Sequence, residues 1–311
     1  MKYLDGLLHR ADEFQRRTPV LAFPLAVWKK FSDDQAGNLA ALIAYYTFVA
    51  IFPLLLVVVT LLDIVLRHNP ELRHHLISSA LSAYPVLGPH IKGSVKPLHS
   101  TGIALVVGLG GAAFGARGIA MAMQNALNTV WAVPLDRRPA FPWSMLRGVG
   151  LIAVVGIGQI VTVSLSGIAG GLGHLLSGTA AEAATIVLAF VLNVGVFWVA
   201  FRLATAAEVS WRELFLSAVL SAASWQILQL IGGFIIGRTL QRSSALYGVF
   251  GVVLGLLAWL YLQAQITLYA AEVGTVRSWR LWPRGLQPPP TEQDRRAYER
   301  YGRADRHLPV D

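Results

Sequence analysis

Four neutral amide side chains fall near the middle of long apolar stretches in this chain of 311 residues. They are Gln159, Asn193, Gln226 and Gln229. An amide that is surrounded by hydrocarbon must turn inward and find hydrogen-bond partners, because lipid offers none. Two interpretations stay open. The amides hydrogen-bond between helices and hold them together, or they line one polar region for an uncharged or amphiphilic substrate.

Groups that carry enzyme chemistry are scarce. The sequence has no Cys, which excludes disulfides, thiol catalysis and Cys-ligated metals. The motifs H-E-x-x-H, G-x-S-x-G and G-x-x-x-x-G-K-[ST] are absent as well. His68, His74 and His75 cluster, but a metal site needs further ligands and supporting partners, so we interpret them as surface residues. We therefore expect no enzyme activity, no catalytic residue, no metal and no cofactor.

The charged residues within the apolar stretches have structural interpretations. Arg117 lies about 24 Å from the outer end of its stretch at 1.5 Å per residue, so its side chain can reach the inner headgroups. A buried ion pair is the alternative. Glu182 and Glu213 follow Thr179 and Ser210 by three positions, which is the spacing of a capping box. No carboxylate is thus expected at mid-depth, which argues against an Asp/Glu proton relay.

The composition places these stretches in a membrane. Apolar residues make up 55% of the chain and charged residues 14%, whereas about a quarter of a soluble domain is charged. Six stretches reach the roughly 18 apolar residues that mark a spanning helix. We therefore predict an all-α, polytopic membrane helix bundle with six transmembrane helices. The predicted ranges are 38–66, 101–120 with an apolar continuation to 133, 146–176, 182–203, 213–237 and 244–276.

Basic residues predict the orientation of the bundle. Residues 1–37 form a basic amphipathic segment, 38–276 form the membrane domain, and 277–311 form a basic tail that we expect to be disordered. Within the membrane domain, residues 67–100 are predicted to form an amphipathic segment on the outer surface. Lys and Arg are about threefold more frequent in the segments that an N-in, C-in topology places in the cytoplasm. The net charge of +9 is then a topology signal, so we expect membrane lipids as partners and no nucleic acid.

Proline and glycine predict the shape and packing of the helices. Pro53 leaves the carbonyl of Val49 without its usual donor, which predicts a kink in the first span. Three pairs of glycines four residues apart each put two small residues on one helix face, which predicts close packing. The pairs are Gly111 and Gly115, Gly233 and Gly237, and Gly251 and Gly255.

Three stretches resemble the YihY/BrkB family of bacterial inner-membrane proteins. They are DQAGNLAA at 34–41, ALNTVW at 126–131 and ALYGVFG at 245–251. The resemblance implies a location in the bacterial inner (cytoplasmic) membrane, an association with the cell envelope and virulence, and a suggested role in transport. The family has also carried the label ribonuclease BN. RNA hydrolysis at a metal centre needs clustered His and carboxylate ligands, which this sequence does not offer, so we expect no such activity.

The leading hypothesis from the sequence is a transporter or flippase-like protein for a lipid or other cell-envelope amphiphile. It depends on the mid-membrane amides, the proline in the first span and the outer amphipathic segment. The alternative is a membrane scaffold that organises envelope partners and transports nothing.

Overall fold

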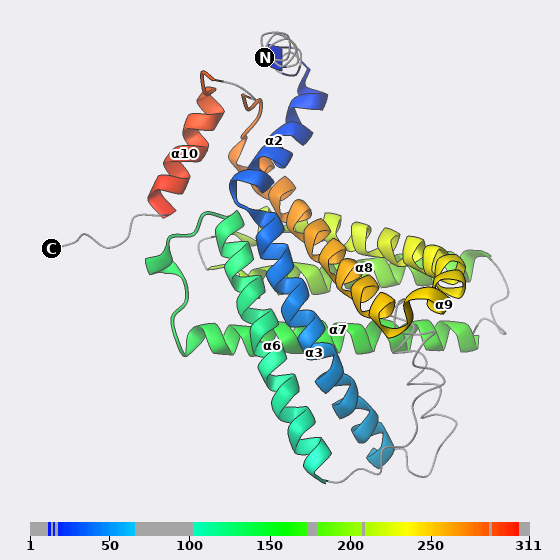
Figure 1. Cartoon of the computed structure of the whole chain (residues 1–311). Coiled ribbons are helices and arrows are strands. Elements are labelled where there is room, and N and C mark those ends of the chain that lie inside the picture. The colour runs from blue at the N-terminus through cyan, green and yellow to red at the C-terminus, as the bar shows by residue number, and fades with distance from the viewer. Residues whose placement is uncertain are drawn as a thin grey trace.

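The structure is a computed structural model of the whole chain, and it describes residues 12–13, 15, 18–65, 102–172, 179–206, 209–285 and 288–304. Throughout these ranges the regular structure is helical (Figure 1). The predicted all-α fold class is therefore confirmed for the described residues. The elements are α2 (Pro19–Asp33), α3 (Ala36–Val65), α6 (Gly102–Val130), the 3-10 turn η1 (Leu135–Arg137), α7 (Trp143–Leu172), α8 (Thr179–Ala204), α9 (Trp211–Trp279) and α10 (Glu292–Ala304).

Six segments of these helices are long and apolar enough to cross a membrane, which confirms the predicted number of spans. They are Ala36–Leu54, Val106–Val130, Trp143–Thr162, Ala183–Ala204, Trp211–Gly232 and Val253–Trp279. Each segment is an uncharged or nearly uncharged run of residues. Such a run forms a helix in a membrane because a helix pairs its backbone N–H and C=O groups within the segment, where lipid offers no partners.

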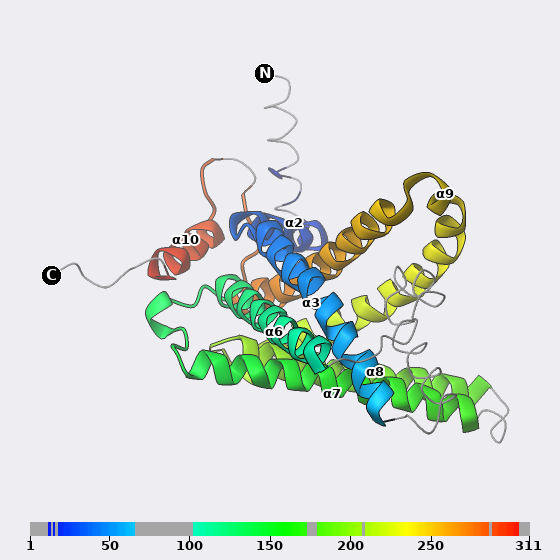
Figure 2. The ribbon, with the colours of Figure 1, turned by 60° about the horizontal axis from the view of Figure 1, so that its bottom comes forward.

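The fifth and sixth predicted spans are both present, but no break in the helix separates them. One helix, α9, runs for 69 residues through both spans. Residues 238–243 contain neither Pro nor Gly, so nothing in that stretch stops a helix. Figure 2 shows α9 turning back on itself near its middle. We call its two spanning parts the first limb (Trp211–Gly232) and the second limb (Val253–Trp279).

Helices α3 and α6 pack closely because α6 carries glycine at the contact. A Cβ atom added to Gly111 would lie 2.9 Å from Cγ of Pro53, and one added to Gly115 would lie 2.5 Å from Cβ of Ala50. Real Cβ atoms do not approach so closely, so any larger residue at Gly115 would push the helices apart. The backbones can approach only where side chains are this small.

Other predictions on helix shape are not tested. Helix α3 continues from Ala36 to Val65 with Pro53 inside it, and the kink at that residue stays a prediction. Close packing at the other two glycine pairs also stays a prediction; these are Gly233, Gly237, Gly251 and Gly255. The outer amphipathic segment 67–100 lies outside the described residues.

The predicted disorder of the basic tail is wrong for residues 292–304. These residues form α10, in which Asp294 and Ala297 are fully buried. Ala297 packs in a small apolar cluster with Ala26 of α2 and Val276 of α9. The tail has too few apolar residues to fold alone, but α2 and α9 supply a surface on which those few suffice. Both α2 and α10 therefore flank the same end of the bundle (Figure 1).

Candidate functional site

The two limbs of α9 run antiparallel and face each other along what we call the seam. A Cβ atom added to Gly274 would lie 2.0 Å from Oγ of Ser217, and one added to Gly232 would lie 2.3 Å from the Trp259 ring. Position 232 follows 217 by fifteen residues, and position 274 follows 259 by fifteen residues. Both limbs therefore cover the same length between the two contacts. At 1.5 Å per residue these contacts lie about 22 Å apart along the helices. The seam therefore runs through most of the thickness of the membrane core.

Four side chains on the seam carry buried polar atoms without a hydrogen-bond partner among the described residues. The atoms are Oγ of Ser217, Oγ of Ser221, Nε1 of Trp259 and Nε2 of Gln263. Ser221 follows Ser217 by four residues, and Gln263 follows Trp259 by four, so each pair shares one helix face. Leaving such a group unpaired costs roughly 1–3 kcal/mol. A column of these atoms inside a spanning helix pair is a candidate binding site for a polar group.

The four amides predicted from the sequence lie on three helices. Asn193 of α8 is buried, and Gln159 of α7, Gln226 and Gln229 are half-buried. Gln226 follows Phe215 by eleven residues and so shares its helix face, which packs on Trp198 of α8.

That face is not the seam. Gln226 of the first limb therefore points to α8, whereas Gln263 of the second limb points to the first limb. Trp198 of α8 contacts Phe215 of α9, and this contact fixes the relative height of the two helices. Asn193 is five residues from Trp198 and Gln226 is eleven from Phe215, so their heights differ by on the order of 10 Å at 1.5 Å per residue. Convergence of all four amides on one region stays a prediction.

The same amide pattern could have revealed Gln263. It lies in the predicted sixth span, as Gln265 does, and both have the residue type that singled out Gln226. The two differ in their surroundings. The amide of Gln265 donates a hydrogen bond to the Tyr261 hydroxyl at 3.0 Å, whereas Nε2 of Gln263 has no such partner among the described residues.

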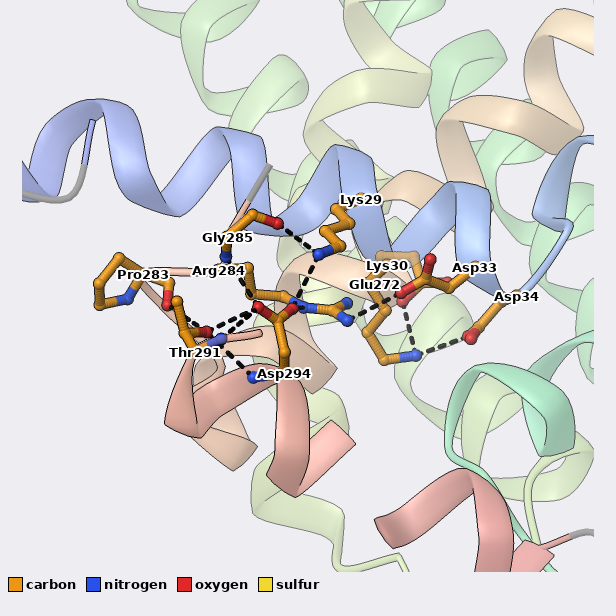
Figure 3. Close-up of polar contacts among 10 residues, drawn as sticks. All are labelled: Lys29, Lys30, Asp33, Asp34, Glu272, Pro283, Arg284, Gly285, Thr291 and Asp294. Atoms are coloured by element: carbon orange, nitrogen blue, oxygen red, sulfur yellow. Dashed lines mark hydrogen bonds and ion pairs between the residues drawn. The ribbon is translucent and has the colours of Figure 1, made fainter. Parts of the chain in front are cut away.

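A second polar feature lies where α9 ends against α2 and α10 (Figure 3). We call it the ion cluster. Its members come from α2, the turn after it, the second limb, the segment before α10, and α10 itself. They are Lys29, Lys30, Asp33, Asp34, Glu272, Arg284 and Asp294.

Asp294 is the centre of one half of the ion cluster. Its buried carboxylate accepts hydrogen bonds from Nζ of Lys29 at 2.9 Å and Nε of Arg284 at 2.9 Å. It also accepts from the backbone N–H of Gly285 at 2.8 Å and from the Thr291 hydroxyl at 2.7 Å. Arg284 bridges onward to Asp33, with 2.8 Å between Nη2 and Oδ2. These contacts fasten α10 to α2 through charged groups on both helices.

These contacts shift the pKa values of the tail residues. Burial by itself raises the pKa of Asp294, but hydrogen bonds from Lys29, Thr291 and Gly285 outweigh burial and hold that pKa well below its usual range. Burial also lowers the pKa of Arg284 by itself, but the carboxylates of Asp33 and Asp294 outweigh that effect and raise the pKa. Both groups therefore stay charged near neutral pH.

Lys30 is the centre of the other half. Its fully buried ammonium donates to Oδ2 of Asp34 at 2.5 Å and to the carbonyl of Val130 at 2.8 Å. Its Nζ also lies 3.0 Å from Oε2 of Glu272. Burial by itself would lower the pKa of Lys30, but the carboxylates of Glu272 and Asp34 outweigh burial and raise it. This half joins α2, the end of α6 and the second limb.

Sequence reasoning missed the ion cluster because its partners are far apart in the chain. Lys30 and Asp34 are four residues apart, which is a visible ion-pair spacing. Lys30 and Glu272, in contrast, come from opposite ends of the sequence. The expectation of disorder hid Asp294 as well. No spacing rule links residues whose contact depends on the fold.

Other predicted features have simple outcomes. Ser210 and Glu213 form the predicted capping box at the start of α9. Arg117 is exposed, which agrees with a side chain that reaches the interface and not with a buried ion pair. Within the described ranges, no group of three or more His, Asp or Glu residues could hold a metal ion.

Six apolar spans, a polar seam within one pair of them and an ion cluster at their end define a polytopic helical membrane protein. The chain belongs to the virulence factor BrkB family, whose model matches residues 27–295. The matched region includes every member of the ion cluster, from Lys29 to Asp294. The family resemblance predicted from the sequence is thereby confirmed.

Curated relatives are similar over most of the chain. The inner membrane protein YhjD of Escherichia coli (strain K12) is 24% identical over 302 residues, which cover 86% of this chain and 84% of the relative. A UPF0761 membrane protein of Stenotrophomonas maltophilia (strain R551-3) is 26% identical over 316 residues, which cover 97% of this chain and 70% of the relative. No solved structure matches the chain.

Proposed function

We propose that this chain is a non-enzymatic transporter or flippase-like protein of the bacterial inner membrane that moves a lipid or other cell-envelope amphiphile. The observation that carries the proposal is the column of unpaired polar atoms on the seam of α9. A lipid headgroup that crosses the membrane needs hydrogen-bonding groups at depth, where hydrocarbon supplies none. Ser217, Ser221 and Gln263 offer such groups at successive levels.

The open packing of the bundle supports the same proposal. In the apolar windows of the six spans, only 11% to 33% of residues are buried. Long apolar faces therefore remain for lipid chains, while the polar seam lies between two limbs of one helix. An amphiphile requires both environments at once, a polar one for its headgroup and an apolar one for its chains. The Escherichia coli relative is named an inner membrane protein, which supports the proposed location.

The experiment is a flipping assay on protein reconstituted in liposomes of bacterial phospholipids. Fluorescent phospholipid that moves between leaflets becomes accessible to an impermeant quencher added outside. We expect the wild-type protein to accelerate this movement over empty liposomes. Gln263→Leu should abolish the acceleration, because it removes the unpaired Nε2 donor from the seam.

The matched control is Gln265→Leu. It makes the same change two residues away, on an amide that bonds to Tyr261. We expect this variant to lose about 0.6–2 kcal/mol of stability but to keep flipping. Equal flipping rates in wild type and Gln263→Leu would show that the seam is not part of the transport path. No activity in wild type with any envelope lipid would favour the scaffold alternative.

A further inference from the structure

The surroundings of Lys30 stabilise an ammonium ion. Its Nζ donates hydrogen bonds to Asp34 and to the Val130 carbonyl, and it lies 3.0 Å from Oε2 of Glu272 in an ion pair. The Nζ also lies 5.3 Å from the centroid of the Trp279 ring, a favourable position for a cation. Lys30 therefore supplies one positive charge at this place.

Glu272 is not fully compensated by that ammonium. Its side chain is completely buried, and neither carboxyl oxygen has a hydrogen bond of acceptable geometry to the described residues. Lys30 also pairs with Asp34, whose side chain is 2% exposed. The contact from Nζ of Lys30 to Asp34 is shorter than its contact to Glu272. One ammonium thus faces two buried carboxylates, and this half of the ion cluster carries one excess negative charge if both are ionised.

The neighbouring cations are committed elsewhere. Arg284 and Lys29 contact Asp294, and Arg284 also contacts Asp33. Two cations and two carboxylates balance in that half of the cluster. From α10, the buried hydroxyl of Tyr301 faces the site and cannot supply a positive charge.

Arg300, also on α10, lies 4.3 Å from the centroid of the Trp279 ring, and its side chain is exposed. The excess charge therefore stays on Glu272 and Asp34.

We propose that Glu272 holds one exchangeable proton beside Lys30, so that this half of the ion cluster is a buried proton-binding site. The proton removes the excess negative charge that a second ionised carboxylate would place beside the single ammonium of Lys30. The bound proton makes the site neutral, and no other chemical change is needed. The inference does not depend on transport and stands or fails separately from it.

The position of the site gives the proton a structural consequence. Lys30 and Asp34 belong to α2 and the turn after it, whereas Glu272 belongs to the second limb. With the proton bound, α2 packs on α9 with balanced charges. When the pH rises and the proton leaves, two buried carboxylates repel each other, and the contact between α2 and α9 weakens. The site is thus expected to loosen on the alkaline side.

The test is infrared difference spectroscopy of the full-length protein in lipid during a pH titration. A protonated carboxyl group has a carbonyl stretching band that a carboxylate lacks. We expect such a band in wild type at about pH 7, where exposed carboxyls are ionised, and its loss as the pH rises. Glu272→Gln and Asp34→Asn should each abolish the titrating band. Glu213→Gln is the matched control and should leave it unchanged, since Glu213 is engaged as a capping carboxylate.

Three outcomes would overturn the proposal. The first is a wild-type spectrum without a protonated carboxyl band at any pH at which the protein stays folded. This measurement needs no variant, so a variant that fails to fold does not weaken it. The second is a titrating band that persists in Glu272→Gln. The third is a band whose intensity stays constant over the whole pH range at which the protein is folded, because the proton would then not exchange.

Discussion

Asp294→Asn is expected to release α10 from the bundle. The wild-type carboxylate is fully buried and accepts from two cations, a backbone N–H and the Thr291 side chain. The amide keeps the shape but has no charge, so Lys29 and Arg284 lose a compensating anion. Breaking a buried ion pair by changing one partner costs about 3–5 kcal/mol. We expect the lower end of that range, because an amide oxygen can still accept some of these bonds.

The effect should be local and measurable by hydrogen exchange. A loss of about 3 kcal/mol corresponds to roughly 100-fold faster exchange at 1.4 kcal/mol per factor of ten. The acceleration should appear in the amides of α10 and not in those of α3 or α6, because the bonds of Asp294 run to α2 and to the segment before α10. Reconstituted wild type and variant are compared at one pH and temperature by mass spectrometry of their peptides.

Glu292→Gln is the matched control for this change. It makes the same acid-to-amide replacement on the same helix, but Glu292 forms an exposed pair with Arg296. Exposed pairs contribute about 0–1 kcal/mol, so exchange in α10 should rise less than roughly fivefold. If Asp294→Asn and Glu292→Gln have the same small effect, the buried ion cluster does not hold α10, and the account of the tail is refuted.

Three other results are expected. Gly115→Leu should separate α3 from α6 and lower the yield of folded protein, because its Cβ would meet Ala50, whereas Gly110→Leu, with nothing within 4 Å, should be tolerated; equal yields in a detergent stability assay would contradict the packing. The docking of α10 should be constant from about pH 7 to about pH 5 and weaken only below about pH 4. Because the pKa of Asp294 is lower in the folded protein than in the unfolded chain, its contribution to stability is fully present above the unfolded-state pKa and is lost as the pH falls through the folded-state pKa. Weaker protection of the α10 amides from exchange already at about pH 6 would contradict this. A reporter fused after Trp282 should behave as cytoplasmic, and an external signal would reverse the proposed topology.

Hydropathy was enough to predict the six spans, because a lipid-facing helix must be apolar along its whole length. Local rules also identified the capping box at Ser210 and Glu213, whose partners are three residues apart. They did not predict that the helix continues between the limbs of α9, through residues without Pro or Gly. Element boundaries inside a continuous helix depend on where the chain turns in space, which a hydropathy pattern does not encode.

The candidate sites were less predictable, for a different reason. Gln263 has the same residue type as Gln226, but the seam is defined by Gly232 and Gly274, which bring two limbs of one helix together. Lys30 and Glu272 meet only after α2 packs on the second limb of α9. Residues that act at such contacts are selected by tertiary packing, and their separation in the sequence has no period to detect.

A transport path along the seam requires that polar molecules reach it, and cysteine labelling measures this access. The chain has no Cys, so a single introduced thiol is the one reactive site. Ser221→Cys places that thiol on the seam, and Ala222→Cys places it one residue away at an equally buried position on another face. We predict that a charged, membrane-impermeant thiol reagent labels Ser221→Cys in intact membranes and leaves Ala222→Cys unlabelled. Protection of both thiols, while both are labelled after denaturation, would mean that the seam is closed to polar molecules and that its unpaired atoms do not form a transport site.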